Sequence, residues 1–158
     1  MRKKRRHLRR LDQIYVPSCA PVFFITCCVH GRSPRLANTT AARVLLDGWN
    51  AALEVHGWAV GRYVVMPDHV HFFASPCADT AQTVSAFVGG WKSWTWKEIR
   101  ARADASFEWQ REFFDHLLRS AESYGQKWEY VRANSVRSGL ANSPDEWPYQ
   151  GEIHTLEW

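Results

Sequence analysis

The stretch WAVGRYVVMPDHVHFFA, residues 58–74, contains two apolar runs separated by a short break. The runs, Trp58–Met66 and His69–Ala74, are rich in β-branched and aromatic residues, which favour strands. Because only Pro67 and Asp68 lie between them, the chain must reverse its direction within this break. The stretch therefore predicts an antiparallel β-hairpin, and the other elements are placed around it.

The elements expected on either side of the hairpin alternate between strand and helix patterns. In order, they are a strand at 22–29, a helix at 38–56 that ends at Gly57, a helix at 80–103, a strand at 109–118 and a helix at 122–134. The first six elements have the order β-α-β-β-α-β of the ferredoxin-like fold, a four-stranded antiparallel sheet with two helices on one face. The sequence therefore predicts an α+β protein with an added C-terminal helix.

The chain has 158 residues, 46% of them hydrophobic, which suits a single domain with a buried core. We expect a flexible basic arm at residues 1–18, one domain at 19–142, and an irregular extension at 143–158 that contains two prolines. The four cysteines form no C-x-x-C pair, and Cys27 and Cys28 are expected to be reduced, small core residues. No apolar run fits a signal peptide or approaches the roughly 18–20 residues of a membrane span. We therefore expect a cytoplasmic protein with no membrane partner.

Positive charge is concentrated at the N-terminus. The net charge is +4, but residues 1–10 hold seven bases and no acid, so the rest of the chain is slightly acidic. Such a block often binds nucleic acid phosphates, although a solvated arm that only aids solubility is the alternative. The bases expected to contact DNA are Arg2, Lys3, Lys4, Arg5, Arg6, Arg9 and Arg10.

His69 and His71 are alternate residues of a predicted strand, so their imidazoles point to the same side. Two such side chains are suited to binding one divalent cation. By itself so short a motif is more often a pair of hydrogen-bonded histidines on a half-exposed strand. The interpretation as a metal site therefore depends on what else the fold brings to this side of the sheet.

The predicted helix at 122–134 supplies the missing groups. Tyr130 lies well outside its apolar stripe, and Asn134 follows four residues later on the same flank. If this helix crosses the sheet near the histidines, Asn134 joins them around a cation beside Tyr130. A cation polarises a phosphodiester, and a tyrosine hydroxyl can attack its phosphorus. The phosphotyrosine formed conserves the bond energy, so we predict a metal-dependent DNA-strand transferase.

With these residues in view, the chain from about Pro21 to Tyr149 resembles the REP-associated tyrosine transposases. These are a branch of the single-tyrosine HUH (His-hydrophobe-His) transposases. The segments that carry the resemblance are Met66–His71 for the HUH strand, Trp109–Arg119 for the fourth-strand motif, and Tyr130–Leu140 for the tyrosine helix. Three motifs in the family's order are far more specific than any one of them.

The resemblance implies that Tyr130 is the nucleophile and that His69, His71 and Asn134 bind Mg²⁺ or Mn²⁺. It also implies a substrate class, single-stranded DNA folded as hairpins from repetitive extragenic palindromes. Cleavage in this family leaves a 5′-phosphotyrosine and a free 3′-OH. This chain departs from the family's pattern at one place, because the family commonly has Asn-Pro where this chain has Asn134–Ser135. Proline would stop the helix sharply, so the end of the helix and the orientation of Asn134 are the features that this difference affects.

The sequence specifies further DNA contacts and the oligomeric state less closely than it specifies the histidines and Tyr130. Lys92 lies among tryptophans of the second helix, where it either lines a DNA groove or is a solvated residue beside core indoles. Arg111, Arg119 and Arg137 are expected phosphate contacts. The protein is expected to act as a monomer or a homodimer. Whether Tyr130 acts in its own subunit or a partner's stays open.

Two other functions compete with this interpretation. One is an HUH replication initiator nuclease, against which the Trp-Gln-Arg strand and the Tyr-x-x-x-Asn spacing argue. The other is a non-catalytic nucleic-acid-binding module, which favours aromatic residues over histidines on the open sheet face. A small metallohydrolase fits less well, because the chain has no H-E-x-x-H motif.

Overall fold

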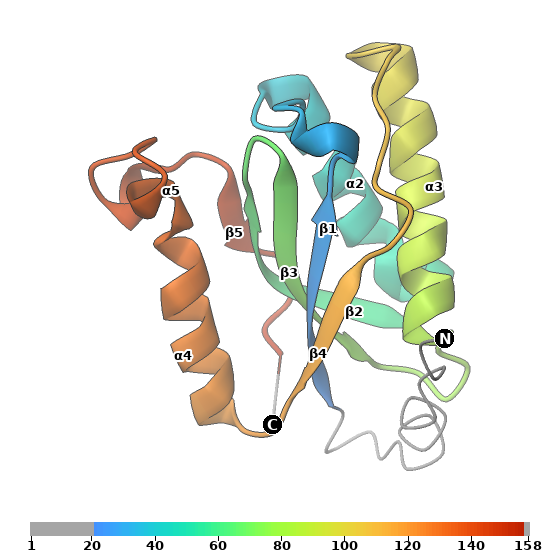
Figure 1. Ribbon diagram of the computed structural model, residues 1–158. Helices are drawn as coiled ribbons and strands as arrows, with labels where there is room; N and C mark the ends of the chain where they lie inside the picture. Colours follow the sequence, from blue (N-terminus) through green and yellow to red (C-terminus); the bar gives the residue numbers. More distant parts are fainter. Residues whose placement is uncertain (1–20, 157–158) are drawn as a thin grey trace, which may run out of the picture.

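The computed structural model of the protein describes residues 21–156 (Figure 1). The expected basic arm, with its seven DNA-binding candidates, lies outside the described residues. The strands are β1 (Val22–Cys28), β2 (Trp58–Val65), β3 (His69–Pro76), β4 (Phe114–Leu118) and β5 (Gln150–Glu152). They form one sheet in the order β4-β1-β3-β2-β5, in which all neighbours are antiparallel. The first four strands thus have the ferredoxin-like order, and the predicted fold class is confirmed with a fifth strand added.

The hairpin predicted from residues 58–74 forms the centre of the sheet. Val65 pairs with Val70, and the amide of Met66 donates to the carbonyl of His69 at 2.8 Å across the turn. On its other side β3 pairs with β1, so β3 is an interior strand. Residues of β3 are therefore held by strands on both sides, which gives the site built on them a rigid base.

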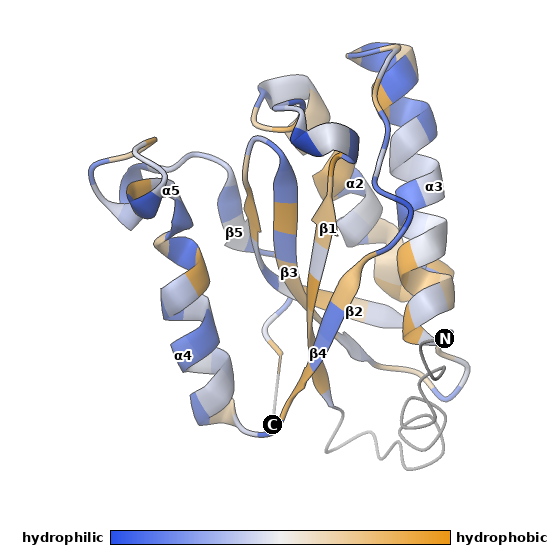
Figure 2. Cartoon of the chain, viewed as in Figure 1, coloured by the Kyte–Doolittle hydropathy of each residue, from blue (hydrophilic) through white to orange (hydrophobic). Residues whose placement is uncertain are grey.

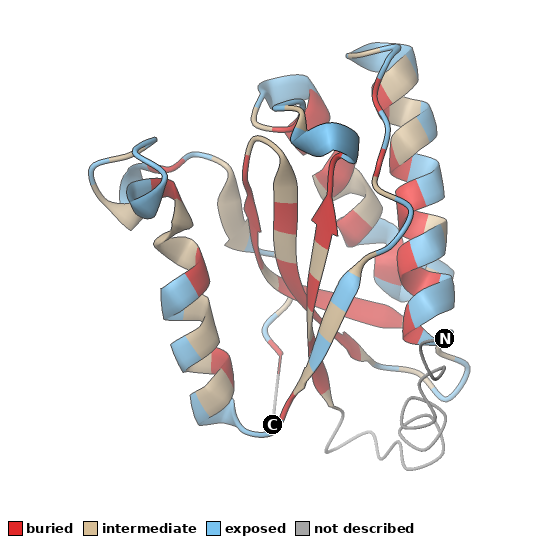
Figure 3. Ribbon diagram, viewed as in Figure 1, coloured by how far each residue is buried: buried red, intermediate tan, exposed pale blue. Residues whose placement is uncertain are grey.

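Two long helices cover one face of the sheet (Figure 1). Helix α2 (Thr39–His56) begins at Asn38, whose side chain accepts from the amide of Ala41, and it ends at Gly57. Helix α3 (Val84–Arg102) begins at the capping residue Thr83. Figure 3 shows buried residues along the sheet and along the sides of α2 and α3 that face it. The side-chain oxygens of Asn38 and Thr83 satisfy amides in the first turn of each helix, which explains why α2 and α3 begin at these residues.

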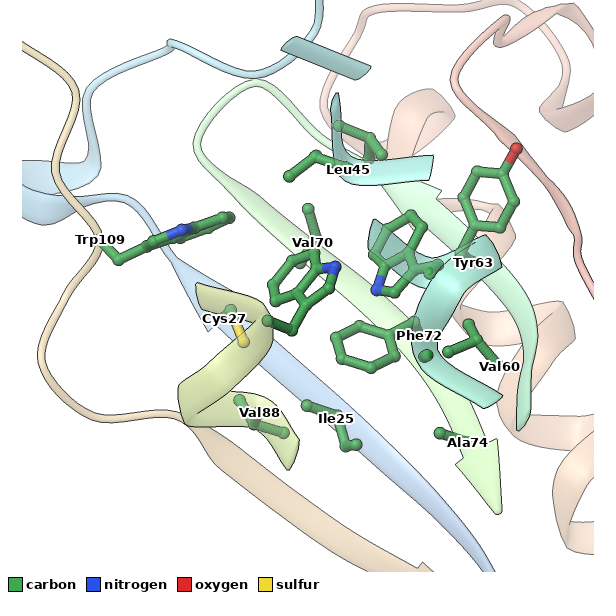
Figure 4. Close-up of a cluster of buried hydrophobic side chains, with 14 of the residues drawn as sticks. Ile25, Cys27, Leu45, Val60, Tyr63, Val70, Phe72, Ala74, Val88 and Trp109 are labelled. Carbon is green, nitrogen blue, oxygen red and sulfur yellow. The ribbon is translucent and has the colours of Figure 1, made fainter. Parts of the chain in front are cut away.

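The core between this face and the two helices is largely aromatic. Trp49 of α2 stacks on Trp91 of α3, with ring centroids 5.3 Å apart and planes inclined by 4°. Phe72 of β3 contacts both indoles, and Figure 4 shows it beside Val70 in this cluster. Much of the chain's tryptophan content is therefore used in the core.

The opposite face of the sheet carries α4 (Ala121–Arg132) and the short α5 (Asn134–Arg137) (Figure 1). The predicted apolar stripe of α4 packs here: Tyr124 contacts Phe73, and Val131 belongs to a buried cluster with Val64. A helix thus covers each face of β3. Among residues 21–156 no helix is both long enough and apolar enough to cross a membrane.

Two expectations about the later elements need correction. The strand expected at 109–118 is regular only at Phe114–Leu118, and Trp109 makes a single bridge with Val29. The extension expected to be irregular contains η3 (Pro144–Glu146) and β5, which pairs with β2. The indole of Trp147 also donates to the carbonyl of Val65 at 3.0 Å. Short segments of this kind gain order from the sheet edge and not from their own sequence pattern.

Candidate active site

The two histidines of β3 point toward the face that carries α4. His71 pairs across the sheet with Thr26 and stacks on Phe24 of β1, with ring centroids 5.2 Å apart and planes inclined by 22°. The rings of His69 and His71 lie 4.7 Å apart. Figure 2 shows hydrophobic and hydrophilic residues alternating along β3 near the hairpin. The expectation that both imidazoles share one side of the strand therefore agrees with the structure.

Hydrogen bonds hold the same nitrogen of each imidazole. His69 Nδ1 lies 2.7 Å from Asp68 Oδ1, and His71 Nδ1 lies 2.7 Å from Thr26 Oγ1. When Nδ1 carries the proton as the donor, Nε2 is the nitrogen left free to bind a metal. A carboxylate or hydroxyl behind each imidazole is the usual support of a metal-binding histidine. Both side chains are thus oriented as ligands that would use Nε2.

The electrostatic environment keeps both imidazoles neutral near pH 7. Burial lowers the pKa of His71 to about 3, and the nearby charges of His69, Lys127, Arg32 and Arg137 act in the same direction. Burial also lowers the pKa of His69, against the opposing effect of its hydrogen bond with Asp68. A metal ligand must offer an unprotonated nitrogen, so this protonation state is the one that binding requires.

Arg32 completes the support beneath His69. Its Nε donates to Asp68 Oδ2 at 2.8 Å, and its guanidinium also lies 3.4 Å from His69 Nδ1 and 3.1 Å from Cys28 Sγ. Arg32 adopts a left-handed backbone conformation with φ of 55°, in η2 (His30–Arg32). Such a conformation costs a side chain about 1–2 kcal/mol. The strain is located at the residue that fixes the Asp68 carboxylate.

Tyr130 is exposed in the candidate site, with 62% of its surface accessible. The guanidinium carbon of Arg137 lies 4.2 Å from the centre of its ring, and Lys127 Nζ lies 5.7 Å from it. Arg137 also donates to Oδ1 of Asn134. Helix α4 ends at Arg132, and Asn134 begins α5, so the helix break occurs at this point without a proline.

A series of side-chain contacts connects the tyrosine to the histidines. Lys127 Nζ lies 4.8 Å above the ring of Phe24, and Phe24 stacks on His71. Helix α4 therefore comes near His71 through Lys127 and Phe24. In the described part of the chain, no group of three or more His, Cys, Asp or Glu side chains could hold a metal. A third protein ligand would have to be of another type, such as the carboxamide of Asn134.

Four residues of this site were not expected from the sequence: Thr26, Arg32, Asp68 and Lys127. Lys127 precedes Tyr130 by three residues, a helical spacing that places both on one flank and that could have identified it. Asp68 adjoins His69, but its bond to Nδ1 could not be read from that position. Thr26 and Arg32 reach the site only through strand pairing and a local backbone turn.

Lys92 requires a correction, because it lies in the helical layer on the other face of the sheet. Its side chain is 9% exposed, and its ammonium donates to the carbonyls of Gln110 at 2.5 Å and of Arg111 and Glu112 at 3.3 Å. It holds the segment between α3 and β4, beside a hollow of about 430 Å³. With its donors occupied by the chain, Lys92 is not available to DNA. Arg111 and Arg119 are exposed, as phosphate contacts would need to be.

No protein-family model matches the chain. Over 97 residues it is 24% identical to an uncharacterised protein of Haemophilus influenzae, covering 49% of this chain and 54% of that protein. Over 57 residues it is 30% identical to an H. influenzae protein provisionally named a REP-associated tyrosine transposase, covering 32% of each. The chain thus spans about half of the first curated relative and a third of the second.

The fold and the two histidines first define a class, α+β proteins with an HUH motif on a central strand. Within that class, the fold is similar to a REP-associated tyrosine transposase solved with a REP hairpin, with a TM-score of 0.68 and 20% identity over 86% of this chain and 78% of that one. It is also similar to a protein from Deinococcus radiodurans R1 described as a transposase, with a TM-score of 0.56 and 17% identity over 75% and 92% of the two chains. The resemblance to REP-associated tyrosine transposases predicted from three motifs is therefore confirmed in the fold.

Proposed function

We propose that the protein is a REP-associated tyrosine transposase that cleaves single-stranded DNA beside a palindromic hairpin and joins it to a new end. The observation that carries the proposal is the arrangement on one sheet face. Two neutral imidazoles with free Nε2 atoms lie there, and Lys127 and Phe24 link them to the exposed Tyr130. The likeness in fold to a transposase bound to a REP hairpin supports the same substrate class.

The proposed metal site uses His69, His71 and Asn134, with the remaining positions left to water and phosphate. A bound Mg²⁺ or Mn²⁺ would polarise the scissile phosphate and neutralise the charge that develops on it. Imidazole nitrogens suit Mn²⁺ better than Mg²⁺, which prefers oxygen ligands, so we expect tighter binding of Mn²⁺. Because Arg137 donates to Asn134 Oδ1 in the structure, that oxygen becomes a ligand only after Arg137 moves.

The proposed covalent step uses Tyr130 as the nucleophile. Its hydroxyl oxygen attacks phosphorus and loses its proton to solvent, the bond from phosphorus to the 3′ oxygen breaks, and that oxygen takes up a proton. The products are a 5′-phosphotyrosine and a free 3′-OH, so a new 3′-OH can reverse the reaction on another DNA end. The outward position of Tyr130 is consistent with attack on a large polymer, because no part of the described chain covers its ring completely.

The test is formation of a covalent adduct on labelled hairpin DNA with single-stranded flanks, in Mn²⁺ or Mg²⁺, detected on a denaturing gel. We expect Tyr130→Phe and addition of EDTA each to abolish the adduct. Tyr149→Phe is the matched control and should leave it unchanged. An adduct of normal yield with Tyr130→Phe would contradict the assignment of the nucleophile. Hairpin binding without any cleavage by the wild-type chain would instead favour a non-catalytic binding module.

A further inference from the structure

The ring of Tyr130 is flanked by two cations that come from different helices. Lys127 lies three residues earlier in α4, on the same flank of the helix. Arg137 lies at the end of α5, and the helix break at Ala133 turns this residue back over the ring. The two cations therefore lie close to Tyr130, the side chain that is proposed to attack an anionic phosphate.

Lys127 is held on the side of the ring that faces the sheet. Its ammonium lies over both the Phe24 and the Tyr130 rings, at 4.8 and 5.7 Å from their centroids. Phe24 in turn stacks on His71. Aromatic faces attract an ammonium without neutralising it. The charge of Lys127 is thus positioned between the nucleophile and the histidines.

Neither cation has an acidic partner in residues 21–156. Neighbouring arginines are paired: Arg32 with Asp68, Arg62 with Glu152, and Arg132 with Asp145. No such ion pair includes Lys127 or Arg137, although Glu129 lies on the same helix and pairs with Arg132. Lys127 is half-buried and Arg137 is exposed, and two such cations without counter-ions make this part of the surface attractive to an anion.

We propose that Lys127 and Arg137 form a two-cation seat for the phosphate that Tyr130 attacks; this inference rests on the proposed function. Lys127 binds a non-bridging oxygen on the side of His71, as a point charge. Arg137 binds the same phosphate from the other side of the ring with its planar guanidinium. To do so, Arg137 exchanges the side-chain oxygen Oδ1 of Asn134 for a phosphate oxygen. Arrival of the substrate therefore releases the Asn134 oxygen toward the metal site.

The first experiment measures the single-turnover rate at which the covalent adduct forms on a hairpin DNA that the wild-type chain cleaves. Lys127→Ala should slow it by about 10²-fold, as the loss of one donor to a developing anion does, and Lys127→Arg should restore most of the rate. Lys97→Ala removes the same charge from an exposed position on α3 and should have no effect. Rates unchanged in both Lys127→Ala and Arg137→Ala would overturn the seat while leaving the proposed function intact.

The second experiment separates phosphate contact from a structural effect. The cleavage position is first mapped with the wild-type chain. In a Tyr130→Phe background, binding affinity is then measured for two hairpins, one with a normal phosphate at that position and one with a neutral methylphosphonate. Lys127→Ala should weaken binding of the first substrate and not of the second. Equal weakening of both would indicate a structural role and would overturn the proposal.

The third experiment does not depend on cleavage. The side-chain resonances of Lys127, assigned by comparison with Lys127→Arg, are followed by NMR during titration with the dinucleotide dTpdT. We expect a shift of these resonances that is absent at Lys97. A shift in a chain that forms no adduct with any hairpin would support the anion seat while contradicting the proposed function. An absence of any shift at Lys127 would count against the seat itself.

Discussion

Two hydrogen bonds decide which nitrogen each imidazole of the candidate site can offer. Asp68 holds His69 and Thr26 holds His71, each through Nδ1. Burial alone would raise the pKa of the Asp68 carboxyl, but the hydrogen bonds from His69 and Arg32 outweigh it and hold that pKa below its usual range. The carboxylate therefore remains charged near neutral pH and can orient the imidazole. At this scale, the site depends on the groups behind the histidines as much as on the histidines.

The neighbouring cysteines of β1 show how one residue step changes the environment of a side chain. Cys27 points into the core on the side of α3, where it is completely buried, and Figure 4 shows it in that cluster. Burial raises the pKa of its thiol to about 12, so almost no thiolate exists at pH 8. Cys77 is exposed after the end of β3, so a reagent can reach it, although partial burial raises the pKa of its thiol as well.

We therefore predict that a thiol reagent such as DTNB distinguishes these cysteines in the native chain. In a Cys19→Ser background at pH 8, one thiol per chain should react quickly, and Cys77→Ser should remove that reaction. Cys27 should react only after unfolding in denaturant. Rapid labelling of Cys27 in the native chain, located by peptide mapping, would show that this part of the core is open.

At the scale of elements, the ends of the helices set the positions of the candidate-site residues. Helix α4 stops at Arg132 and α5 starts at Asn134, although Ser135 stands where the transposases that the sequence resembles commonly have proline. Ser135 is fully buried, so packing and not a missing amide hydrogen is what holds the break. Helix α2 ends in a different way. Gly57 ends it in a left-handed conformation, and the strand β2 that leads to the hairpin follows directly.

Substitution of two glycines should have opposite effects on stability. Gly57 has φ of 75°, and an added Cβ would lie 2.8 Å from the backbone Cα of Ala81, so Gly57→Ala should lower the free energy of unfolding by about 2 kcal/mol or more. Gly125 lies inside α4 with open space around it, so Gly125→Ala should raise that free energy by about 0.5–1 kcal/mol. Urea unfolding followed by tryptophan fluorescence measures both. A neutral Gly57→Ala would mean that the turn before β2 can rearrange.

At the scale of the whole molecule, the two faces of the sheet are built differently. The face toward α2 and α3 is closed by a large aromatic core, whereas the face toward α4 has two smaller buried clusters. The C-terminal segment contributes to both of these smaller clusters, through Trp147 and Leu156. Trp147 shares its cluster with Val131 of α4 and donates to Val65 of β2. The segment after residue 142 therefore fixes the helix that carries Tyr130.

Removal of the Trp147 side chain should loosen that helix. We expect Trp147→Ala to lower the free energy of unfolding by about 3 kcal/mol and to increase hydrogen exchange in residues 121–137. Trp94→Ala is the control, because Trp94 is 40% exposed, and it should change stability by less than about 0.5 kcal/mol. Exchange in α4 equal to that of the native chain would show that its docking does not need the C-terminal segment.

By itself the sequence determined the features that depend on local periodicity and caps. These include the hairpin, the capped start of α2, the common side of His69 and His71, and the position of Tyr130 outside the apolar stripe. Each follows from spacings of two to four residues, which the backbone geometry of strands and helices converts directly into direction. The order of the first four strands followed from these elements and the rules that connect them.

Only the tertiary structure decided how distant segments meet. The pairing of β5 with β2, the bond from Thr26 to His71, and the capture of Lys92 by backbone carbonyls join residues that no local pattern relates. The same holds for the contacts that place Lys127 between Phe24 and Tyr130. Such contacts depend on which surfaces remain unsatisfied once the sheet has formed, and they are therefore properties of the assembled fold.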